Sequence, residues 1–370
     1  MTSRGAIHSP LVVWTLLIAG ILATAYAWKY RQPLGTSDFK ILYASAESPP
    51  ARMFVALPGA RPNMNPPQFQ VLLRPLTAFP LPVASAIFRA ISIASLCVCV
   101  WWLARTPDHR WDLLDLGAAL AWAPMATVLN LNQVTWILWP LLLGAWWCWR
   151  QDRWTAGSIA FGVAFSLKPF LGVFLLWLLA TRRWKAAGVA ASTAAIGWAA
   201  GLLFYGVDVF RAWLAALGQV QWWWSPMNAS LEGWLARLFN GTGRPLVTLP
   251  PLVAPLALIG QLLIIIVTIQ RTRARTIDDS WTTLMAASLL ASPLGWIYYV
   301  WWVLPGSRPA RLLFQSPMLW LPLMFVAFSP NRVVSATLGS FYFWGLLTVW
   351  LNGLRGRAGE SPAAGPSRVS

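Results

Sequence analysis

Charged residues are scarce in this chain of 370 residues. They make up 11% of the sequence, whereas hydrophobic residues make up 58% and the mean hydropathy is +0.57. Soluble domains carry about 25% charged residues because their surfaces face water. The composition therefore excludes a water-soluble protein and predicts a membrane protein.

Histidine and cysteine are also rare. The two histidines, His8 and His109, lie in polar flanks, so they cannot ligate a haem between spans or build a His-based zinc site. The three cysteines lie in apolar runs and indicate buried thiols rather than a disulfide framework. The chain lacks a GxxxxGK[ST] loop and a GxGxxG turn after a strand, the usual marks of an ATP or dinucleotide site. We therefore expect no metal and no cofactor.

Tryptophan and basic residues, by contrast, are abundant. The 27 tryptophans are typical of membrane–water boundaries, and many boundaries imply many spans. The net charge of +17 would suggest nucleic acid in a soluble chain, but here the cations lie in short loops between apolar runs. We therefore expect membrane lipids as partners, and no nucleic acid.

The N-terminal part predicts one span and a large external loop. The apolar run Leu11–Trp28 follows Arg4 and lacks a clear cleavage site, which indicates a retained span with the N-terminus inside. The proline-rich stretch 29–82 predicts the first external loop, with helices only around Ser37–Glu47 and Gln68–Ala78. A second external segment is expected at about residues 206–250.

Apolar runs predict the remaining spans, and two of them are interrupted. The run between Arg150–Arg153 and Arg182–Lys185 holds only about 25 residues around Lys168-Pro169, too few for two spans of about 20, so it predicts a broken helical hairpin. The run Trp281–Pro305 repeats this pattern around Ser292-Pro293. The full spans are expected at Val83–Ala104, Leu113–Val128, Val134–Trp149, Ala186–Tyr205, Leu252–Ile269, Leu312–Phe328 and Val334–Leu351.

These segments predict an all-α fold, a multi-pass transmembrane helical bundle of about ten to twelve membrane segments. Residues 1–354 form one domain, and the Pro/Gly/Ser-rich residues 355–370 are expected to be a disordered cytoplasmic tail. Because the short cationic turns belong inside, both termini are expected in the cytoplasm and the protein in the plasma membrane.

Few residues could carry acid–base chemistry on the external side. Only four acids are expected there: Asp38, Glu47, Asp208 and Glu232. Asp38 is the best placed, since it opens a helix-like segment close to the first span, although an N-cap carboxylate would occupy the same position. The other three are expected to be solvated.

Lys168 differs from the other external cations because it interrupts an apolar hairpin at membrane depth. A charge costs about 2.5–3.5 kcal/mol there on insertion scales, so Lys168 either snorkels to the interface or has a function. The tip of a broken hairpin can reach only the external interface, so a functional Lys168 would act there. Arg52, Arg61 and Arg74 are expected on the same side.

An ordered set of short motifs resembles the membrane GT-C glycosyltransferases of family 87. The set comprises Ser37–Ala46, Asn65-Pro66-Pro67, Leu72–Leu76, Leu81-Pro82, Asn132-Gln133-Val134, Ala156-Gly157, Leu167-Lys168-Pro169, Arg182-Arg183-Trp184, and Ser292-Pro293 with Trp296. The family pattern has an aromatic pair where Leu42-Tyr43 stands, a glycine at Asn132, and often a histidine where this chain has Tyr298 and Tyr299.

The resemblance implies a GT-C fold and transfer of a hexose, mannose in the first instance. The donor would be a polyprenyl-phosphate sugar, the acceptor a lipid or glycan on the outer face, and the anomeric carbon would be inverted. The resemblance assigns the general base to Asp38. Because the phosphate of such a donor must lie at the external interface, we predict that Lys168 contacts it, with Arg52, Arg61 and Arg74 as further candidates. The substrate-lining residues are expected to be Tyr43, Asn65, Gln133, Trp296 and Tyr298.

Two other functions remain open at this point. A transporter or flippase of lipid-linked sugars would also use broken helices, but it would need a polar pathway through both halves of the membrane. The expected charges lie mostly on one side, which favours one-sided chemistry. A non-catalytic cell-envelope scaffold is the third alternative.

Overall fold

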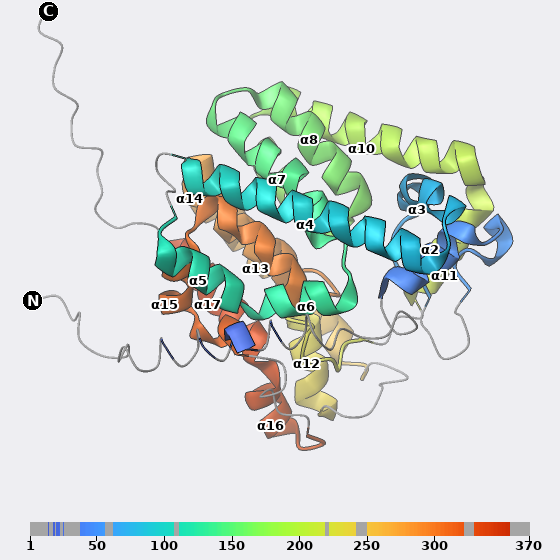
Figure 1. The fold of residues 1–370 in the computed structure, drawn as a ribbon. Helices are drawn as coiled ribbons and strands as arrows, with labels where there is room; N and C mark the ends of the chain where they lie inside the picture. Colours follow the sequence, from blue (N-terminus) through green and yellow to red (C-terminus); the bar gives the residue numbers. More distant parts are fainter. Residues whose placement is uncertain are drawn as a thin grey trace, which may run out of the picture.

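A computed structural model describes residues 38–55, 62–106, 111–218, 222–241, 250–321 and 329–355, together with isolated positions between Trp14 and Ala25. These residues form helices joined by short turns (Figure 1). In this part of the chain the only β-type pairing is an isolated bridge between Asn228 and Trp296. The predicted all-α fold is therefore confirmed.

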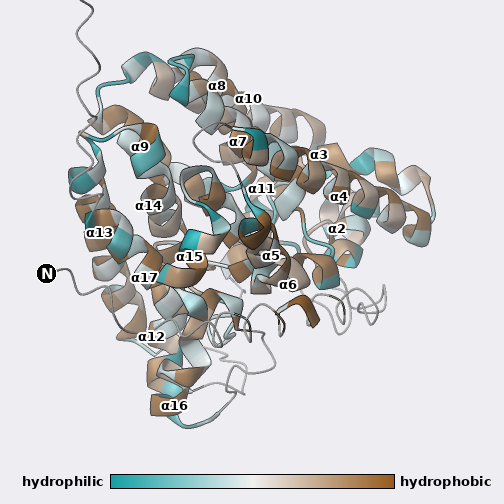
Figure 2. Ribbon diagram, turned by 60° about the vertical axis from the view of Figure 1, so that its left-hand side comes forward, coloured by the Kyte–Doolittle hydropathy of each residue, from teal (hydrophilic) through white to brown (hydrophobic). Residues whose placement is uncertain are grey.

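Several helices are long and apolar enough to cross a membrane. They are α4 (Leu81–Arg105), α10 (Trp184–Tyr205), α13 (Val253–Thr272) and the segment Arg332–Arg355, which contains α16 (Arg332–Ala336) and α17 (Phe341–Arg355). Hydrophobic residues are spread along the helices, and hydrophilic ones lie mainly in turns and near helix ends (Figure 2). The protein is thus a multi-pass integral membrane protein.

A bent helix pair supplies a further candidate span. Helix α5 (Leu113–Ala121) and helix α6 (Ala123–Leu131) meet at an angle of 50°. Pro124 causes the break, because its ring clashes with the carbonyl one turn earlier and it has no N–H to donate. With this pair, the described residues contain up to five candidate spans. The predicted ten to twelve membrane segments also count the short helices of the broken hairpins and the run 11–28. Most of the run 11–28 lies outside the described residues.

Both predicted broken hairpins consist of short helices. In the first, α8 (Trp154–Leu167) ends at Lys168, and η5 (Pro169–Leu171) leads into α9 (Gly172–Ala180). In the second, α14 (Ile277–Leu290) is followed by a turn at Ser292-Pro293 and by η6 (Ile297–Gly306). A proline disfavours the helical conformation of the residue before it, which explains the breaks at Lys168 and Ser292.

The prediction of one continuous helix over Leu312–Phe328 is wrong in its described part. Helix α15 (Pro309–Gln315) stops before Ser316, and the short helix η7 (Pro317–Trp320) follows. Pro317 ends α15 for the same reason as in the hairpins. Residues 322–328 lie outside the described part.

Tryptophan serves the core as well as the boundary. Ten tryptophans in the described residues are fully buried, and several of them contact one another, such as Trp122 with Trp320 at 5.2 Å and Trp122 with Trp301 at 5.3 Å between ring centroids. The tryptophans therefore do not all mark membrane–water boundaries.

The predicted cytoplasmic turns gather at one end of the bundle. Helix α7 (Thr135–Arg150) ends at Arg150, which forms an ion pair of 3.2 Å with Asp278 at the start of α14. Arg275 donates hydrogen bonds of 2.6 Å to the carbonyls of Gly353 and Leu354 at the end of α17. These contacts show that turns far apart in sequence lie on the same side of the molecule.

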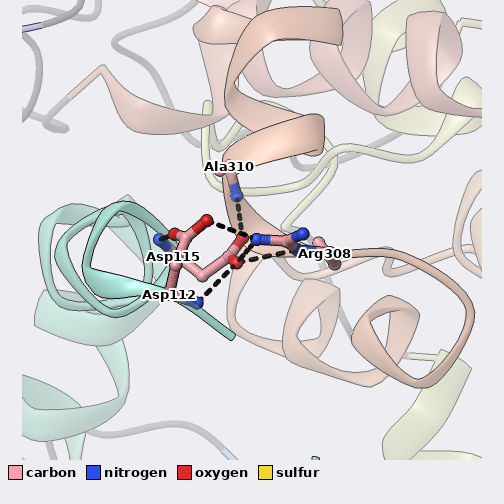
Figure 3. Close-up of polar contacts among 4 residues, drawn as sticks. All are labelled: Asp112, Asp115, Arg308 and Ala310. Atoms are coloured by element: carbon pink, nitrogen blue, oxygen red, sulfur yellow. Dashed lines mark hydrogen bonds and ion pairs between the residues drawn. The ribbon is translucent and has the colours of Figure 1, made fainter. Parts of the chain in front are cut away.

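An ion-pair cluster joins two more of these turns (Figure 3). Arg308 lies 2.7 Å from the Asp112 carboxylate and also binds the buried carboxylate of Asp115, which accepts the backbone N–H of Ala310 at 3.0 Å. Asp112 and Asp115 cap α5 reciprocally. The Asp115 backbone N–H, and then Arg308, lower the pKa of Asp112.

Helices α2 (Asp38–Glu47), α3 (Pro67–Leu73) and α11 (Val207–Gly218) lie at the opposite end of α4 and α10 (Figure 1). The predicted helices at Ser37–Glu47 and Gln68–Ala78 are confirmed, the second as α3 followed by η3 (Arg74–Ala78). The candidate site lies at this end, away from the cationic turns.

Candidate active site

Helix α2 places Asp38 at its first turn and is fixed by its buried face. The Phe39 ring packs on Phe88 of α4, with 4.7 Å between ring centroids. The Tyr43 hydroxyl donates a hydrogen bond of 2.9 Å to the carbonyl of Phe79, which precedes α4. The structure therefore places the hydroxyl of Tyr43, one of the expected substrate-lining residues, in the packing of α2.

The tip between α6 and α7 brings Gln133 to Asp38. Asn132 has φ = 54°, and its side-chain N–H₂ donates to the Ser85 hydroxyl of α4 at 3.2 Å. Glycine and asparagine tolerate this left-handed conformation best, which explains why asparagine can stand where the resembling sequences have glycine. Gln133 follows and donates a hydrogen bond to the carboxylate of Asp38.

Lys168 lies between α8 and η5, at the tip of the first broken hairpin. Its Nζ donates a hydrogen bond of 2.6 Å to Oδ1 of Asn65 and lies 5.0 Å from the centroid of the Tyr299 ring. Asn65 is itself held, since its backbone N–H and side-chain amide donate to Oδ1 of Asn63 at 2.9 and 3.0 Å. The Asp38 carboxylate interacts electrostatically with the Lys168 ammonium group, so the two charges belong to one site.

Helix η6 supplies the aromatic side of the site. The rings of Trp296 and Tyr298 stack at 5.8 Å, and those of Tyr298 and Tyr299 meet edge to face at 4.7 Å. All three side chains are buried. Trp296 and Tyr298 were predicted as site residues, whereas Tyr299 was not, although its place after the SPxxW element was a usable signal.

A buried asparagine holds the turn that precedes η6. Oδ1 of Asn228 accepts the backbone N–H groups of Gly295 at 2.9 Å and Ser230 at 3.1 Å, and its Nδ2 donates to the Pro293 carbonyl at 3.1 Å. A Cβ at Gly295 would lie 2.3 Å from the Leu289 carbonyl oxygen, so only glycine fits there. The SPxxW turn is therefore fixed by Asn228 to the segment 222–241.

Arg237 stabilises the same segment from α12 (Leu231–Asn240). Its side chain is fully buried, although it carries a charge. Its Nη1 donates to the carbonyls of Ser225 at 2.7 Å and Asn228 at 3.0 Å, and its Nε donates to the Ser340 hydroxyl at 2.7 Å. Arg237 thus acts within the fold and does not face lipid.

The other three acids that were expected on the external side lie apart from this cluster. Glu47 is exposed at the far end of α2, which is about 15 Å long at 1.5 Å per residue. Asp208 pairs with Arg211 at 2.9 Å on the exposed side of α11. Glu232 lies on α12, and burial raises its pKa. Asp38 is therefore the acid whose described contacts lead to Gln133 and Lys168.

The additional candidates for phosphate binding have different positions. Arg52 lies in η2 (Pro50–Arg52), beyond the C-terminal end of α2, and its side chain is exposed. Arg74 is exposed at the end of α3, whereas Asn65 precedes the start of that helix. Neither joins the described contacts of Lys168, and Arg61 lies outside the described residues.

The arrangement combines a carboxylate, a cation and aromatic rings at one end of the bundle. A carboxylate can accept the proton of an attacking hydroxyl, and an ammonium group can stabilise a departing phosphate. Within the described ranges there is no group of three or more His, Cys, Asp or Glu side chains that could hold a metal ion. The residues present therefore suit group transfer between an alcohol and a phosphate ester.

Comparison with known proteins agrees with this chemistry. Residues 63–294 match glycosyltransferase family 87, and this stretch is more than half of the chain. It contains Asn65, Gln133 and Lys168, while Asp38 precedes it and Tyr299 follows it. Comparison with curated proteins gives no match, and comparison with solved structures gives none either. On the extent of the family match, the chain belongs to glycosyltransferase family 87.

Proposed function

We propose that this glycosyltransferase moves a hexose, mannose in the first instance, from a polyprenyl-phosphate sugar to a lipid or glycan acceptor. The reaction takes place at the outer face of the plasma membrane, with both termini in the cytoplasm. The observation that carries the proposal is the cluster of Asp38, Gln133, Lys168 and Asn65, which four separate segments bring together.

Asp38 is the general base in this proposal. The acceptor hydroxyl oxygen attacks the anomeric carbon, the bond from that carbon to the phosphate oxygen breaks, and the hydroxyl proton passes to the Asp38 carboxylate. Attack from the face opposite the leaving group inverts the anomeric centre. For the proton transfer, the hydroxyl must lie about 2.6–3.2 Å from the carboxylate. The hydrogen bond from Gln133 supports this role because it orients the carboxylate.

Lys168 binds the donor phosphate in this proposal. Its described short contacts are with the neutral amide of Asn65 and the ring of Tyr299, so an incoming phosphate adds an anionic partner beside it. The departing polyprenyl phosphate gains negative charge in the transition state, and a positioned ammonium group stabilises that charge. A phosphate that is part of the donor also agrees with a sequence in which no nucleotide-binding loop is found.

A transfer assay tests the proposed function. Purified protein is incubated with labelled polyprenyl-phosphate mannose and a membrane lipid extract, and labelled products are separated. We expect time-dependent transfer to an acceptor in the extract and release of polyprenyl phosphate. Movement of intact donor across vesicle membranes without bond cleavage would favour the flippase. If neither transfer nor movement occurs with any polyprenyl-phosphate hexose, the scaffold is favoured.

A further inference from the structure

Helix α11 follows the span α10 directly and is divided into three faces. Gly206, with φ = +79°, ends α10 and starts the turn into α11. Val209 and Ala216 form a buried face of α11. Asp208 and Arg211 form an exposed polar face through their ion pair. The third face is apolar and exposed.

The exposed apolar face continues the lipid-facing surface of α10. Val207, Leu214 and Leu217 are 51%, 59% and 36% exposed, and their spacing places them on one side of a helix. At the end of α10, Leu203 and Phe204 are 86% and 67% exposed. Because α10 is long and apolar enough to span the membrane, its exposed leucine and phenylalanine face lipid, and the apolar face of α11 adjoins them.

The buried side of α11 leads to the candidate active site. The cluster formed by Val209 and Ala216 includes Met53 and Phe54, and Trp213 packs against it. The Trp213 indole N–H donates a hydrogen bond of 3.1 Å to the carbonyl of Met64. The next residue, Asn65, accepts the hydrogen bond from Lys168. One hydrogen bond and one peptide unit thus separate α11 from the residue that orients Lys168.

We propose that α11 lies in the plane of the membrane, with Val207, Leu214 and Leu217 in contact with lipid, and that Trp213 thereby fixes Asn65 and Lys168 relative to the lipid surface. An amphipathic helix with a polar face towards water is typical of such interfacial helices. The partner is the lipid boundary and not another protein, because the apolar face is continuous with that of a span. Lipid contact itself does not depend on the proposed reaction.

Spin labels on α11 test the lipid contact without measuring activity. Single cysteines replace Val207, Leu214 or Leu217 in a variant in which Cys97, Cys99 and Cys148 are alanine, and the labelled protein is placed in phosphatidylethanolamine–phosphatidylglycerol vesicles. Oxygen collects in the hydrocarbon and a nickel chelate stays in water. We expect the three labels to be more accessible to oxygen than to the nickel chelate, as a label at Leu203→Cys should be. A label at Asp208→Cys should be more accessible to the nickel chelate.

Two results would overturn the lipid contact. One is nickel accessibility at Leu214 and Leu217 equal to that at Asp208, which would place the face in water. The other is spin–spin broadening between molecules at these positions, which would mean that a second copy covers the face.

A matched pair of variants tests the connection to the site. Leu214→Glu puts a charge on the apolar face, and Ala215→Glu puts the same charge at the exposed neighbouring position on the polar side. We expect Leu214→Glu to raise the KM for a polyprenyl-phosphate donor and Ala215→Glu to leave it unchanged. If Leu214→Glu displaces α11 from the lipid and the KM for the donor stays unchanged, the connection through Trp213 is wrong. Absence of transfer in the unmodified protein would contradict the proposed function instead, leaving the spin-label result valid.

Discussion

At the scale of single residues, the site pairs each charge with an uncharged amide. Gln133 holds the Asp38 carboxylate, and Asn65 holds the Lys168 ammonium group. An amide orients a charged group without changing its charge. This division suits a reaction in which a hydroxyl loses a proton while a phosphate departs.

Replacing Asp38 with asparagine should abolish most of the transfer. The amide keeps the shape of the side chain but cannot accept the hydroxyl proton, and general-base catalysis contributes about 10²–10⁴ in rate. We expect kcat to fall by that factor in the transfer assay while the melting temperature stays within a few degrees. If the Asp38→Asn variant is folded and has the wild-type kcat, Asp38 is not the general base and only occupies the start of α2. Glu47, Asp208 and Glu232 would then be tested.

Replacing Lys168 with methionine should weaken use of the donor. Methionine keeps the length of the chain and removes the charge that we assign to the donor phosphate. We expect a fall in kcat/KM for polyprenyl-phosphate sugar of about tenfold or more, since hydrogen bonds to charged groups contribute roughly 1.5–3 kcal/mol. The exposed Arg74→Met variant is the control. Wild-type kinetics for Lys168→Met would mean that the phosphate binds elsewhere.

Two substitutions at Tyr299 separate its ring from its hydroxyl. The ring lies 5.0 Å from the Lys168 ammonium, a distance at which a cation is attracted to the face of an aromatic ring. Tyr299→Phe keeps this attraction and Tyr299→Leu removes it, so only the leucine variant should raise the donor KM. Equal effects of the two variants in steady-state kinetics would instead point to the hydroxyl.

The sequence predicted the charged residues of the site more completely than their partners. Asp38 and Lys168 stand out because acids are few on that side and a lysine inside an apolar run costs free energy. Tyr299 could not be selected in this way, because its contact with Lys168 depends on how two hairpins pack. The burial of Arg237 could not be predicted either, because only the fold shows that loop carbonyls surround it.

At the scale of elements, the SPxxW turn depends on a partner from another segment. Asn228 bonds to Pro293 and Gly295 across more than sixty residues, and Ala229 donates to the Gly295 carbonyl at 2.7 Å. These bonds fix the start of η6, and with it Tyr298 and Tyr299. The position of the aromatic side of the site therefore depends on the segment that contains Asn228.

Asn228→Ala should destabilise the protein and impair transfer. It leaves buried backbone groups without partners, at a cost of about 1–3 kcal/mol for each such group. We expect a lower melting temperature and, at temperatures where the variant is folded, a lower kcat/KM. The exposed Asn240→Ala on the end of α12 should match the unmodified protein in both measurements. Unchanged melting and kinetics for Asn228→Ala would show that the turn holds its shape without this side chain.

Element boundaries followed from the sequence wherever a strong local signal existed. The helices α4, α10 and α13 were predicted within a few residues because long apolar runs end at charged or proline-containing turns. Both broken hairpins were predicted from a proline within a run that is too short for two spans. The bend between α5 and α6 was missed because Pro124 lies in a run whose length suits one straight span.

At the scale of the whole molecule, polar contacts at one end of the bundle complement the site at the other. Arg150 with Asp278, Arg275 with the end of α17, and Arg308 with Asp115 each connect turns far apart in sequence. The pair of Arg150 and Asp278 fixes the ends of α7 and α14, whose opposite ends adjoin Gln133 and the SPxxW turn. The sequence suggested that these turns share a side through their charge, but the individual pairs follow only from packing.

Removing the buried carboxylate of this cluster should destabilise the bundle. Asp115→Ala leaves Arg308 and the N–H of Ala310 without their shared acceptor, and breaking a buried pair costs about 3–5 kcal/mol. Because the Arg308 side chain is half-exposed, we expect the loss of unfolding free energy to lie at the lower end of that range. Asp208→Ala removes an exposed pair with Arg211 and should cost at most about 1 kcal/mol. Thermal unfolding in detergent compares the two, and equal melting temperatures would contradict a stabilising role for Asp115.

The burial of Asn228 also bears on how the protein can be produced. Asn228-Ala229-Ser230 is an acceptor sequence for N-linked glycans, which eukaryotic cells attach to unfolded segments on the luminal side, the side that the proposed topology gives to this segment. A glycan there would occupy the space that Gly295 and Pro293 require, so modified chains could not close the turn. The sequence cannot simply be removed, because the Ser230 hydroxyl caps α12 and the Ala229 N–H is bonded to Gly295. A host that does not glycosylate asparagine is therefore the one in which every synthesised chain can reach this fold.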